Sequence, residues 1–228
     1  MIDVCIPVLA RPQNAAKVLT SLRDSTTLPY RVLFVASPGD HAQIDELQRL
    51  RVDYIWMEDP PGPGDFARKT NTAFNHLDGD WFFAGADDLE FTPGWDREAM
   101  MVAASTGCSV IGTNDGANPQ VVRGLHATHM LFKRSYVEDG GATWHDGPGV
   151  VYSETYDHQW VDAEAVAVAK QRGEWAFARN SLVLHHHPIF DKTVVMDETY
   201  AKALAKGRED GRVFQQRRNQ ALAVYRQR

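Results

Sequence analysis

The segment Trp81-Phe82-Phe83-Ala84-Gly85-Ala86-Asp87-Asp88-Leu89 joins a short apolar run to two adjacent carboxylates. The run 81–84 is apolar and aromatic, which predicts a buried β-strand. Asp87 and Asp88 therefore follow a core strand, where a charge without a counter-charge or a metal ion is costly. Because open α/β sheets bind ligands beyond the carboxyl ends of their strands, this pair suits a hard divalent cation that also holds phosphate oxygens. The alternative is an Asp-Asp turn that caps the next helix, which Pro93-Gly94-Trp95 also fits.

Strand-like and helical patterns alternate through the first half of the chain. The expected strands are residues 3–8, 30–36, 52–57 and 81–84, and the expected helices are residues 14–23, 40–50 and 66–77. This alternation predicts an α/β fold with a mostly parallel sheet flanked by helices. The second half is less regular, with expected helices at 96–105 and 157–172, strands at 108–112, 127–132 and 175–184, and a charged helical tail at 197–228.

Size and composition fit one globular domain with a helical extension. The chain has 228 residues, and no apolar run approaches the roughly 20 residues that span a bilayer. The first residues lack the basic start and the apolar stretch of a signal peptide, so they are expected to form a strand. Cys5 and Cys108 lie in apolar runs and are expected to be buried thiols, as in a reducing cytoplasm.

Charge is unevenly distributed along the chain. The net charge of −6 does not favour a general nucleic-acid binder. The C-terminal region is nevertheless basic, and only Glu209 and Asp210 oppose its cations: Lys202, Lys206, Arg208, Arg212, Arg217, Arg218, Arg226 and Arg228. This stretch is interpreted either as a solvated helix face or as a surface for an anionic acceptor.

Three consecutive histidines, His185-His186-His187, end the last expected strand. Side chains alternate along a strand, so His185 and His187 should share one face. Taken singly, each is more typical of a polar surface residue than of a ligand. Imidazole together with the carboxylate pair suits Mn²⁺ or a similar ion better than Ca²⁺, so we expect at least one metal ligand among them. His126 and His129 should lie on opposite faces of their strand and are not expected to share a metal.

Two further segments carry candidate chemistry. Asp157, Asp162 and Glu164 lie in one helical neighbourhood, and one of them could accept a proton from a hydroxyl, or all could form salt bridges on an amphipathic helix. The segment Asp65-Phe66-Ala67-Arg68-Lys69-Thr70-Asn71 opens a helix after a glycine-rich loop. Free N–H groups and the helix dipole favour phosphate there, although the segment does not match a P-loop.

Taken in order, these motifs resemble those of GT-A glycosyltransferases, most closely of the family 2 type. Residues 6–12 resemble the opening strand and its Ile-Pro-Thr-x-x-Arg turn, and residues 66–74 resemble the helix before the central strand. Ala86-Asp87-Asp88, followed by Pro-Gly-Trp, resembles the DxD-like metal motif. Residues 131–134 with Gly140-Gly141 resemble the acceptor-side strand and its loop. Asp162-x-Glu164 is spaced like the Glu-Asp base motif, and residues 185–188 resemble the late metal-ligand histidine.

The chain also departs from the family pattern. The second strand ends in Val35-Ala36-Ser37-Pro38-Gly39-Asp40, where the family usually has Asp-Asp-Gly-Ser for the nucleotide base. Asp40 or Asp65 is expected to take this role. Val161 stands where the Glu of the Glu-Asp pair would be. The compact size and the Asp-His-x-x-Val-Asp-x-Glu run look like small bacteriophage glycosyltransferases, some of which modify hydroxymethylated DNA bases and others virion proteins or host glycans.

The resemblance implies a catalytic domain at residues 1–190, with a donor-binding half at about 1–95 and an acceptor half at about 96–190, and a helical C-terminal extension at 191–228. It implies a transferase that uses Mn²⁺ or Mg²⁺ and a nucleotide-sugar donor, with a UDP-sugar such as UDP-glucose expected. Asp88 would coordinate the metal, Asp87 the metal's water shell or the ribose, and His185 or His187 would complete the site. Implied donor contacts are Pro7, Arg11, Asp65, Arg68, Lys69, Asn71 and Asp87.

For an inverting reaction, Asp162 would accept the acceptor proton, with Asp157 and Glu164 as the other candidates. The acceptor is expected to be a hydroxyl, with 5-hydroxymethylpyrimidine in phage DNA as one hypothesis and protein or cell-surface glycan as alternatives. A nucleotidyltransferase and a non-catalytic sugar- or metal-binding module also remain open. The expected location is the cytoplasm, that of the host if the protein is viral.

Overall fold

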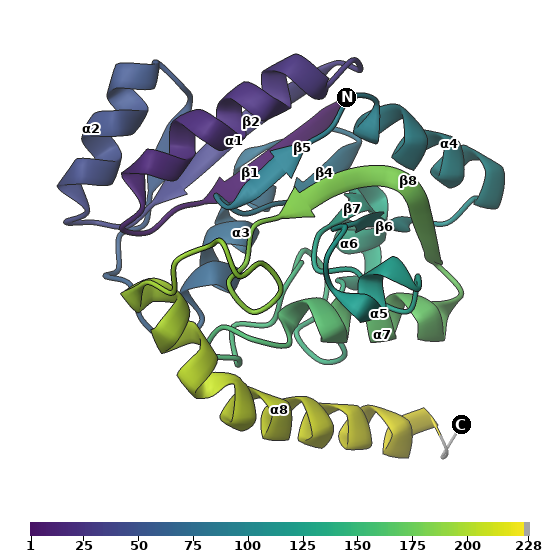
Figure 1. Ribbon diagram of the computed structural model, residues 1–228. Helices are drawn as coiled ribbons and strands as arrows, with labels where there is room; N and C mark the ends of the chain where they lie inside the picture. The colour runs from purple at the N-terminus through teal and green to yellow at the C-terminus, as the bar shows by residue number, and fades with distance from the viewer. Residues whose placement is uncertain (226–228) are drawn as a thin grey trace.

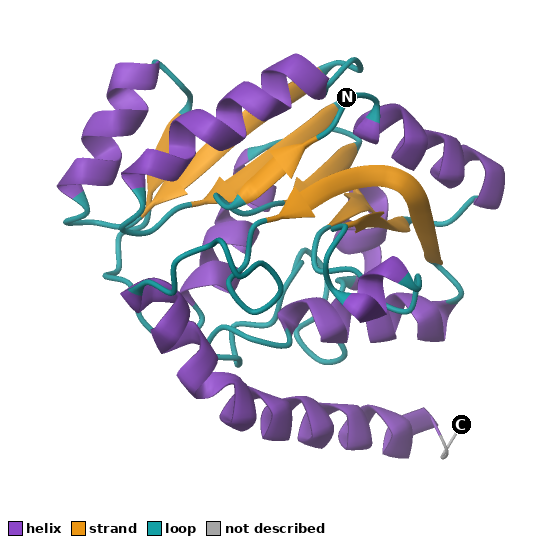
Figure 2. Ribbon diagram, in the orientation of Figure 1, coloured by secondary structure: helices purple, strands orange, loops and turns teal. Residues whose placement is uncertain are grey.

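An eight-stranded sheet forms the centre of the protein, and helices cover both of its faces (Figure 2). The computed structural model describes residues 1–225. The strands are β1 (Ile2–Pro7), β2 (Tyr30–Ala36), β3 (Tyr54–Trp56), β4 (Trp81–Ala84), β5 (Leu89–Phe91), β6 (Val110–Asn114), β7 (Met130–Lys133) and β8 (Trp175–His185). The helices are α1 (Pro12–Ser25), α2 (His41–Leu50), α3 (Asp65–His76), α4 (Trp95–Thr106), α5 (Pro119–Val122), α6 (Arg134–Gly140), α7 (Val161–Arg172) and α8 (Glu198–Tyr225).

The strand order is β3-β2-β1-β4-β7-β6-β8-β5, and the sheet is mixed. β3, β2, β1 and β4 are parallel, whereas β7 runs antiparallel to both β4 and β6, and β5 runs antiparallel to β8. The expectation of a mostly parallel sheet was therefore wrong. The chain returns from β6 to β7 through a loop that contains only the four-residue helix α5, and such a return gives antiparallel neighbours without a crossover helix.

Alternating strand residues divide the core between the two faces of the sheet. In β4, Phe82 and Ala84 pack with α3, α6 and α7, whereas Phe83 packs with α1, α2 and α4 on the opposite face. Both faces of β1 and β4 are buried, as is usual for central strands that helices cover on both sides. The strand expected at residues 81–84 is confirmed, and its apolar run is explained by this double coverage.

The helix expected to begin at Asp157 begins instead at Val161. The backbone N–H groups of residues 157–159 donate to the carboxylate of Asp210 in α8, and Trp160 has a positive φ of 71°. The preceding segment is thus held as a turn by a residue far along the chain. Cys5 is fully buried in β1, whereas Cys108 is partly exposed.

One edge of the sheet collects the ends of several strands. Ala84 at the end of β4 pairs with Met130 at the start of β7, so His129 lies beside the turn that carries Asp87 and Asp88. Leu89 pairs with His185 at the end of β8, and the His186 N–H donates to the Asp88 carbonyl at 3.0 Å. β8 arches across the sheet toward this edge (Figure 1). The fold therefore brings the carboxylate pair and the histidine triplet together.

The C-terminal tail forms α8, which packs beside α7 and the loop before it and bends partway along its length (Figure 1). Arg226 and Arg228 of the basic stretch lie outside the described residues. Over residues 1–225, none of the helices combines the length and the apolar character that a membrane crossing needs.

Candidate functional site

Arg11 joins the two carboxylates at the end of β4. Its Nη2 lies 2.6 Å from Oδ1 of Asp87, and its Nη1 lies 3.8 Å from Oδ2 of Asp88. The turn before Arg11 is formed by Ala10, which has a positive φ of 55° and whose N–H donates to Asp40 at 2.6 Å. A non-glycine residue in this region is strained and is held there by its surroundings. Arg11 thus enters the site from the loop between β1 and α1.

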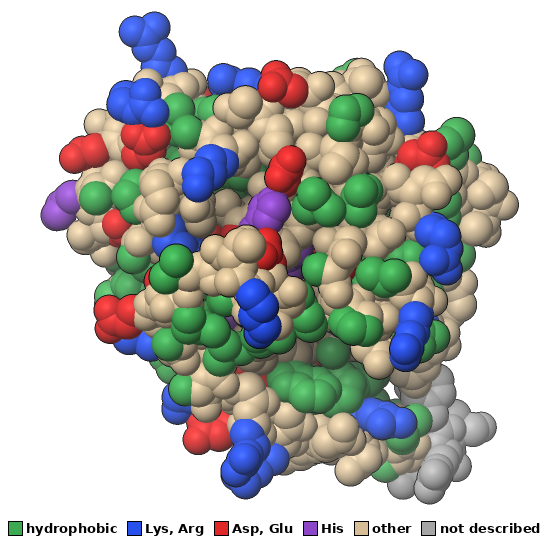
Figure 3. Space-filling model, viewed as in Figure 1, with side chains coloured by type: hydrophobic (Ala, Val, Ile, Leu, Met, Phe, Trp, Pro, Cys, Tyr) green, Lys and Arg blue, Asp and Glu red, His purple; other side chains and the backbone are tan. Residues whose placement is uncertain are grey.

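Histidines at or next to the ends of two strands, β7 and β8, face the carboxylates. His185 Nε2 lies 3.4 Å from Oδ1 of Asp88, and the ring of His129 stands edge-on to that of His185 with centroids 5.0 Å apart. The His187 ring lies 5.2 Å from that of His185, although β8 ends at His185 and His187 lies beyond the strand. His186 points elsewhere and pairs with Glu90 at 2.8 Å. Histidine and acidic side chains lie side by side near the middle of the face in Figure 3.

Several buried polar atoms at this site have no hydrogen-bond partner among residues 1–225: Oδ2 of Asp87, Oδ1 of Asp88, Nδ1 of His185 and Nε2 of His129. Unsatisfied buried groups are rare and call for an explanation, such as a bound ion or ligand. Carboxylate oxygen with imidazole is a donor set that fits Mn²⁺. Within the described part of the chain, no three His, Cys, Asp or Glu side chains already lie close enough to hold a metal. The residues therefore fit a cation that takes further ligands from a bound substrate.

The pKa values of Asp87 and Asp88 are shifted in opposite directions. Burial, with repulsion from Asp88, raises the pKa of Asp87 to about 7, although Arg11 opposes this change. Burial also acts on Asp88, but its contacts with His185 and Arg11 hold the pKa of that carboxyl well below its usual range. Asp88 is therefore the permanently charged member of the pair. Burial lowers the pKa of His129 to about 4, so its imidazole is neutral and able to act as a ligand.

The residues at the start of α3 that were expected to bind phosphate make contacts within the protein instead. Lys69 is only 1% exposed, and its Nζ donates to the Val8 carbonyl at 2.8 Å and pairs with Asp65 at 2.7 Å. Burial lowers the pKa of Lys69. Arg68 lies 3.5 Å from Asp65 and is partly exposed. Lys69 and Asp65 thus tie α3 to the end of β1, and in this geometry Lys69 supports the structure of the site.

Three other expected donor contacts also make internal bonds. Asn71 accepts from the N–H groups of Val151 and Tyr152 and donates to Glu154, which fastens the segment 151–154 to α3. Pro7 is buried at the end of β1, in register with Val35. Asp40 caps α2 and receives the Ala10 N–H, so its carboxylate is engaged.

Asp162 and His126 form a pair at the start of α7. Nε2 of His126 lies 3.0 Å from Oδ2 of Asp162, and Oδ1 accepts from the Ala163 N–H at 2.8 Å. Burial opposes ionisation of both groups, but their attraction lowers the pKa of Asp162 and raises that of His126. The carboxylate of Asp162 also opposes the lowering of the pKa of His129 and contributes to the raised pKa of His185.

Glu164 and Asp157, the other expected proton acceptors, lie in structural contacts. Glu164 is 1% exposed; it accepts from Tyr156 and pairs with Arg217 of α8 at 2.8 Å. Its carboxylate oxygens are fully used by these and by the Trp144 N–H. Asp157 contributes its backbone to the turn that Asp210 caps. Of the three, Asp162 is the one whose carboxylate contacts a histidine, His126.

Two site residues were not predicted from the sequence. His129 was set aside because its spacing from His126 did not suit a shared metal, and the structure places the two in different contacts. The Nδ1 of His129 lies 3.0 Å from the Ala84 carbonyl, which fixes the ring beside β4. Tyr200 comes from α8, and its hydroxyl donates to Oδ2 of Asp88 at 2.9 Å. No local motif marks Tyr200, because its partner lies far away in the sequence.

The family profile described as Glycosyl transferase family 2 matches residues 3–157, which is more than half of the chain. The chain therefore belongs to this family. A comparison with curated protein sequences gives no match.

Solved structures show the same fold at low sequence identity. The mannosyltransferase PcManGT from Pyrobaculum calidifontis, in complex with GDP-Man and Mn²⁺, has a TM-score of 0.65 and 13% identity over 82% of this chain and 57% of that one. TarS from S. aureus gives 0.62 and 13% over 82% and 60%. Glucosyl-3-phosphoglycerate synthase from Mycobacterium tuberculosis, in complex with Mn²⁺, UDP-glucose and phosphoglyceric acid, gives 0.57 and 11% over 82% and 71%. The chain thus spans less than two thirds of the first two proteins.

Proposed function

We propose that this protein is a metal-dependent glycosyltransferase that moves a sugar from a nucleoside diphosphate sugar to a hydroxyl group. The observation that carries the proposal is the contact at 3.4 Å between Nε2 of His185 and Oδ1 of Asp88, a buried oxygen with no hydrogen-bond partner within residues 1–225. Membership of glycosyl transferase family 2 supports this activity. Two proteins of the same fold hold Mn²⁺ together with a nucleotide sugar, which supports the same pair of ligands here.

The proposed donor site uses the residues at the end of β4. When bound, a divalent cation offsets the negative charge that develops on the leaving diphosphate. Oδ1 of Asp88 and the imidazole of His185 would hold it, with His187 and His129 close by. Oδ2 of Asp87 is free to accept a ribose hydroxyl, and Arg11 has an unpartnered Nε and Nη1 within residues 1–225 that suit a phosphate oxygen.

Asp162 is the proposed proton acceptor if the reaction inverts the anomeric centre. Its low pKa keeps the carboxylate charged at neutral pH, and the charge of His126 would stabilise that state. Because His126 contacts one oxygen and the Ala163 N–H the other, the carboxylate has a fixed orientation. A base held in this way contributes through orientation as well as proton affinity. A retaining reaction would not require it.

The proposal gives the acceptor only as a chemical class, a compound with a free hydroxyl group. DNA that contains 5-hydroxymethylpyrimidine is one of the acceptors to be tested. The basic stretch offers less positive surface than the sequence indicated, because Arg217 is buried against Glu164. Lys202 and Lys206 pair with neighbouring Glu198 and Glu209. Tyr152 is 1% exposed and packs in the core, so it cannot stack on a nucleotide base without rearrangement.

A screen of nucleotide sugars with Mn²⁺ tests the proposal. Release of nucleoside diphosphate would be measured for UDP- and GDP-sugars, first with water as acceptor and then with glycans, peptides and hydroxymethylated DNA. The proposal expects release from one donor class and a hexose-shifted product with one acceptor. Incorporation of the nucleotide itself would show a nucleotidyltransferase, and tight binding without release in every arm would show a non-catalytic module.

A further inference from the structure

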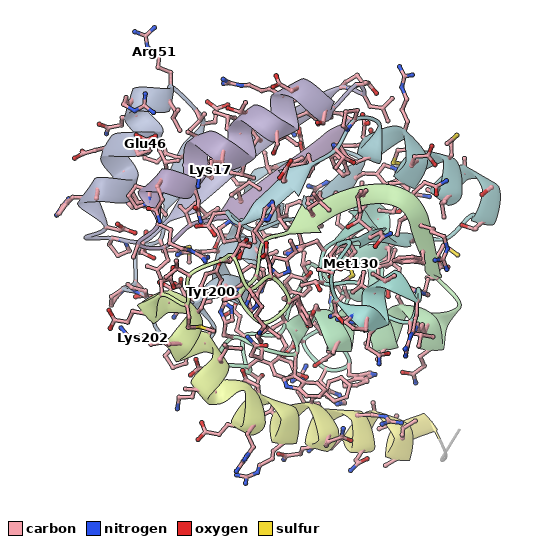
Figure 4. The ribbon with its side chains drawn as sticks, viewed as in Figure 1. Lys17, Glu46, Arg51, Met130, Tyr200 and Lys202 are labelled. Carbon is pink, nitrogen blue, oxygen red and sulfur yellow. The ribbon has the colours of Figure 1, made fainter. Side chains whose placement is uncertain are left out.

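Tyr200 reaches the carboxylate site from the first turns of α8. Figure 4 shows it on the inner side of this helix, whereas Lys202 lies on the outer side. The Tyr200 hydroxyl donates to Oδ2 of Asp88 at 2.9 Å and also lies 3.3 Å from the His186 carbonyl. Its side chain is buried, with 7% of the residue exposed. Tyr200 thus fills a place in direct contact with the group proposed to hold the metal.

Each carboxylate of the pair has one oxygen fixed by a neighbour and one oxygen unpartnered in the described structure. Asp87 Oδ1 accepts from Arg11, and Oδ2 has no partner. Asp88 Oδ2 accepts from Tyr200, and Oδ1 has no hydrogen-bond donor and faces His185. A carboxylate with one oxygen held can rotate little, so its other oxygen has a defined direction. Hydrogen bonds to a side chain that coordinates a metal affect the affinity of the site for that metal.

The ring of Tyr200 contacts the other groups that orient the site. The guanidinium carbon of Arg11 lies 4.4 Å from the ring centroid, a cation–π distance. The ring of His187 stands edge-on at 4.9 Å, and His187 in turn packs against His185. One side chain therefore touches Asp88 directly, acts on Asp87 through Arg11, and acts on His185 through His187.

α8 holds Tyr200 in place through bonds on both sides of it. The Tyr200 N–H donates to Asp197 at 2.9 Å, which caps the start of the helix. Further along, Asp210 accepts three backbone N–H groups of the turn before α7, and Arg217 pairs with the buried Glu164. α8 follows the segment that the family profile matches, residues 3–157. Tyr200 therefore lies outside the segment that the family profile matches, whereas its partner Asp88 lies within it.

We propose that Tyr200 is a positioning residue of the donor site: its hydroxyl directs the free oxygen of Asp88 toward His185, and its ring holds Arg11 on Asp87. The inference rests on the proposed function, because it concerns how firmly the chain holds the cation. Tyr200 itself is not a ligand in this arrangement. Tyr200 restricts the motion of the side chains of Asp88, Arg11 and His187, so that they are already ordered when the metal and the nucleotide bind.

The test compares Mn²⁺ binding by wild type and Tyr200→Phe in the presence of UDP or GDP, by electron paramagnetic resonance of free Mn²⁺. Phenylalanine keeps the ring on Arg11 and His187 but removes the hydroxyl from Asp88. We expect Mn²⁺ affinity to fall by about 10-fold, the lower end of the range for groups behind a metal ligand. The melting temperature without metal should stay close to that of wild type.

Tyr30→Phe is the matched control, because Tyr30 is the first residue of β2, at the end of that strand away from the carboxylate site, and its hydroxyl makes no hydrogen bond within residues 1–225. It should bind Mn²⁺ as wild type does. If Tyr200→Phe is less stable, the rise in melting temperature on adding Mn²⁺ and nucleotide gives the same comparison, and a smaller rise than in wild type supports the inference.

Unchanged or tighter Mn²⁺ binding by Tyr200→Phe overturns the role of Tyr200 but not the proposed function. Tighter binding would show that the hydroxyl obstructs the site. Failure of wild type to bind Mn²⁺ with either nucleotide overturns the proposed metal dependence and the inference with it. The two failures are therefore distinguished by the behaviour of the wild-type protein.

Discussion

Oδ2 of Asp162 lies 3.0 Å from Nε2 of His126, and this contact orients the carboxylate at the start of α7. The two residues come from the loop before β7 and from the first turn of α7. The pair gives the proposed base a fixed direction and a charge partner. It also distinguishes Asp162 from Asp157 and Glu164, whose contacts are with the turn before α7 and with α8.

Asp162→Asn should slow the chemical step more than it weakens donor binding. The amide keeps the size and one hydrogen bond but cannot accept the proton, and a general base typically contributes about 10²–10⁴-fold. Turnover and nucleotide affinity would be measured separately. Asp157→Asn is the matched control and should keep near-normal turnover. An inactive Asp157→Asn beside an active Asp162→Asn would show that the base has been assigned to the wrong carboxylate.

Asp88→Asn should lower turnover by orders of magnitude and leave the fold intact. Asparagine keeps the volume and the bond from Tyr200, but it removes the charge that a cation needs. Activity in Mn²⁺ and the melting temperature would be compared with those of Asp59→Asn, a change in an exposed loop. Near-normal activity of Asp88→Asn would contradict its assignment as a metal ligand.

EDTA should abolish activity, and Mn²⁺ or Mg²⁺ should restore it. The leaving diphosphate has few other counter-charges here, because Lys69 is committed to Asp65 and Val8 and the charge of Arg11 is already shared with Asp87. Initial rates would be measured across a titration of metal into chelated protein. Full activity in excess chelator would indicate a metal-independent enzyme in which Arg11 provides the positive charge.

Glu164→Gln should destabilise the protein by about 3 kcal/mol, the lower end for breaking a buried ion pair, since Arg217 keeps a second carboxylate partner in Asp146. Its effect should be on stability, with kcat close to that of wild type after correction for folded protein. Urea unfolding would measure the change. Glu198→Gln, which removes an exposed pair with Lys202, should leave the unfolding midpoint unchanged. A large loss of kcat in fully folded Glu164→Gln would assign Glu164 a chemical role.

The sequence predicted those parts of the site that depend on local pattern. The apolar run before Asp87 marked the end of a central strand. His185 and His187 do lie close together, but β8 ends at His185, so the period of a strand does not account for the position of His187. The direction of β7 was not predictable, because apolar patterns do not distinguish parallel from antiparallel partners of a buried strand. Tyr200 was not predictable either, because its contact with Asp88 joins residues 112 positions apart. This contact depends on where α8 packs. The periodicity of a helical sequence predicts the helix but not the residues that it packs against.

The His126–Asp162 pair should make stability depend on pH. Although burial opposes protonation of His126, the nearby Asp162 carboxylate raises the folded-state pKa of His126 above its ordinary value of about 6.5. Protonated His126 therefore adds stability that is fully present below the unfolded-state pKa and is lost as pH rises through the folded-state pKa.

The substitution His126→Gln removes this pH-dependent contribution to stability. The difference in unfolding free energy between wild type and His126→Gln, from urea titrations, should be larger at about pH 5 than at about pH 9. His41→Gln, a change at an exposed position at the start of α2, is the control and should show no such trend. A difference for His126→Gln that does not change with pH would mean that the pair does not bind a proton more tightly in the folded state, and that Asp162 must keep its charge without help from His126.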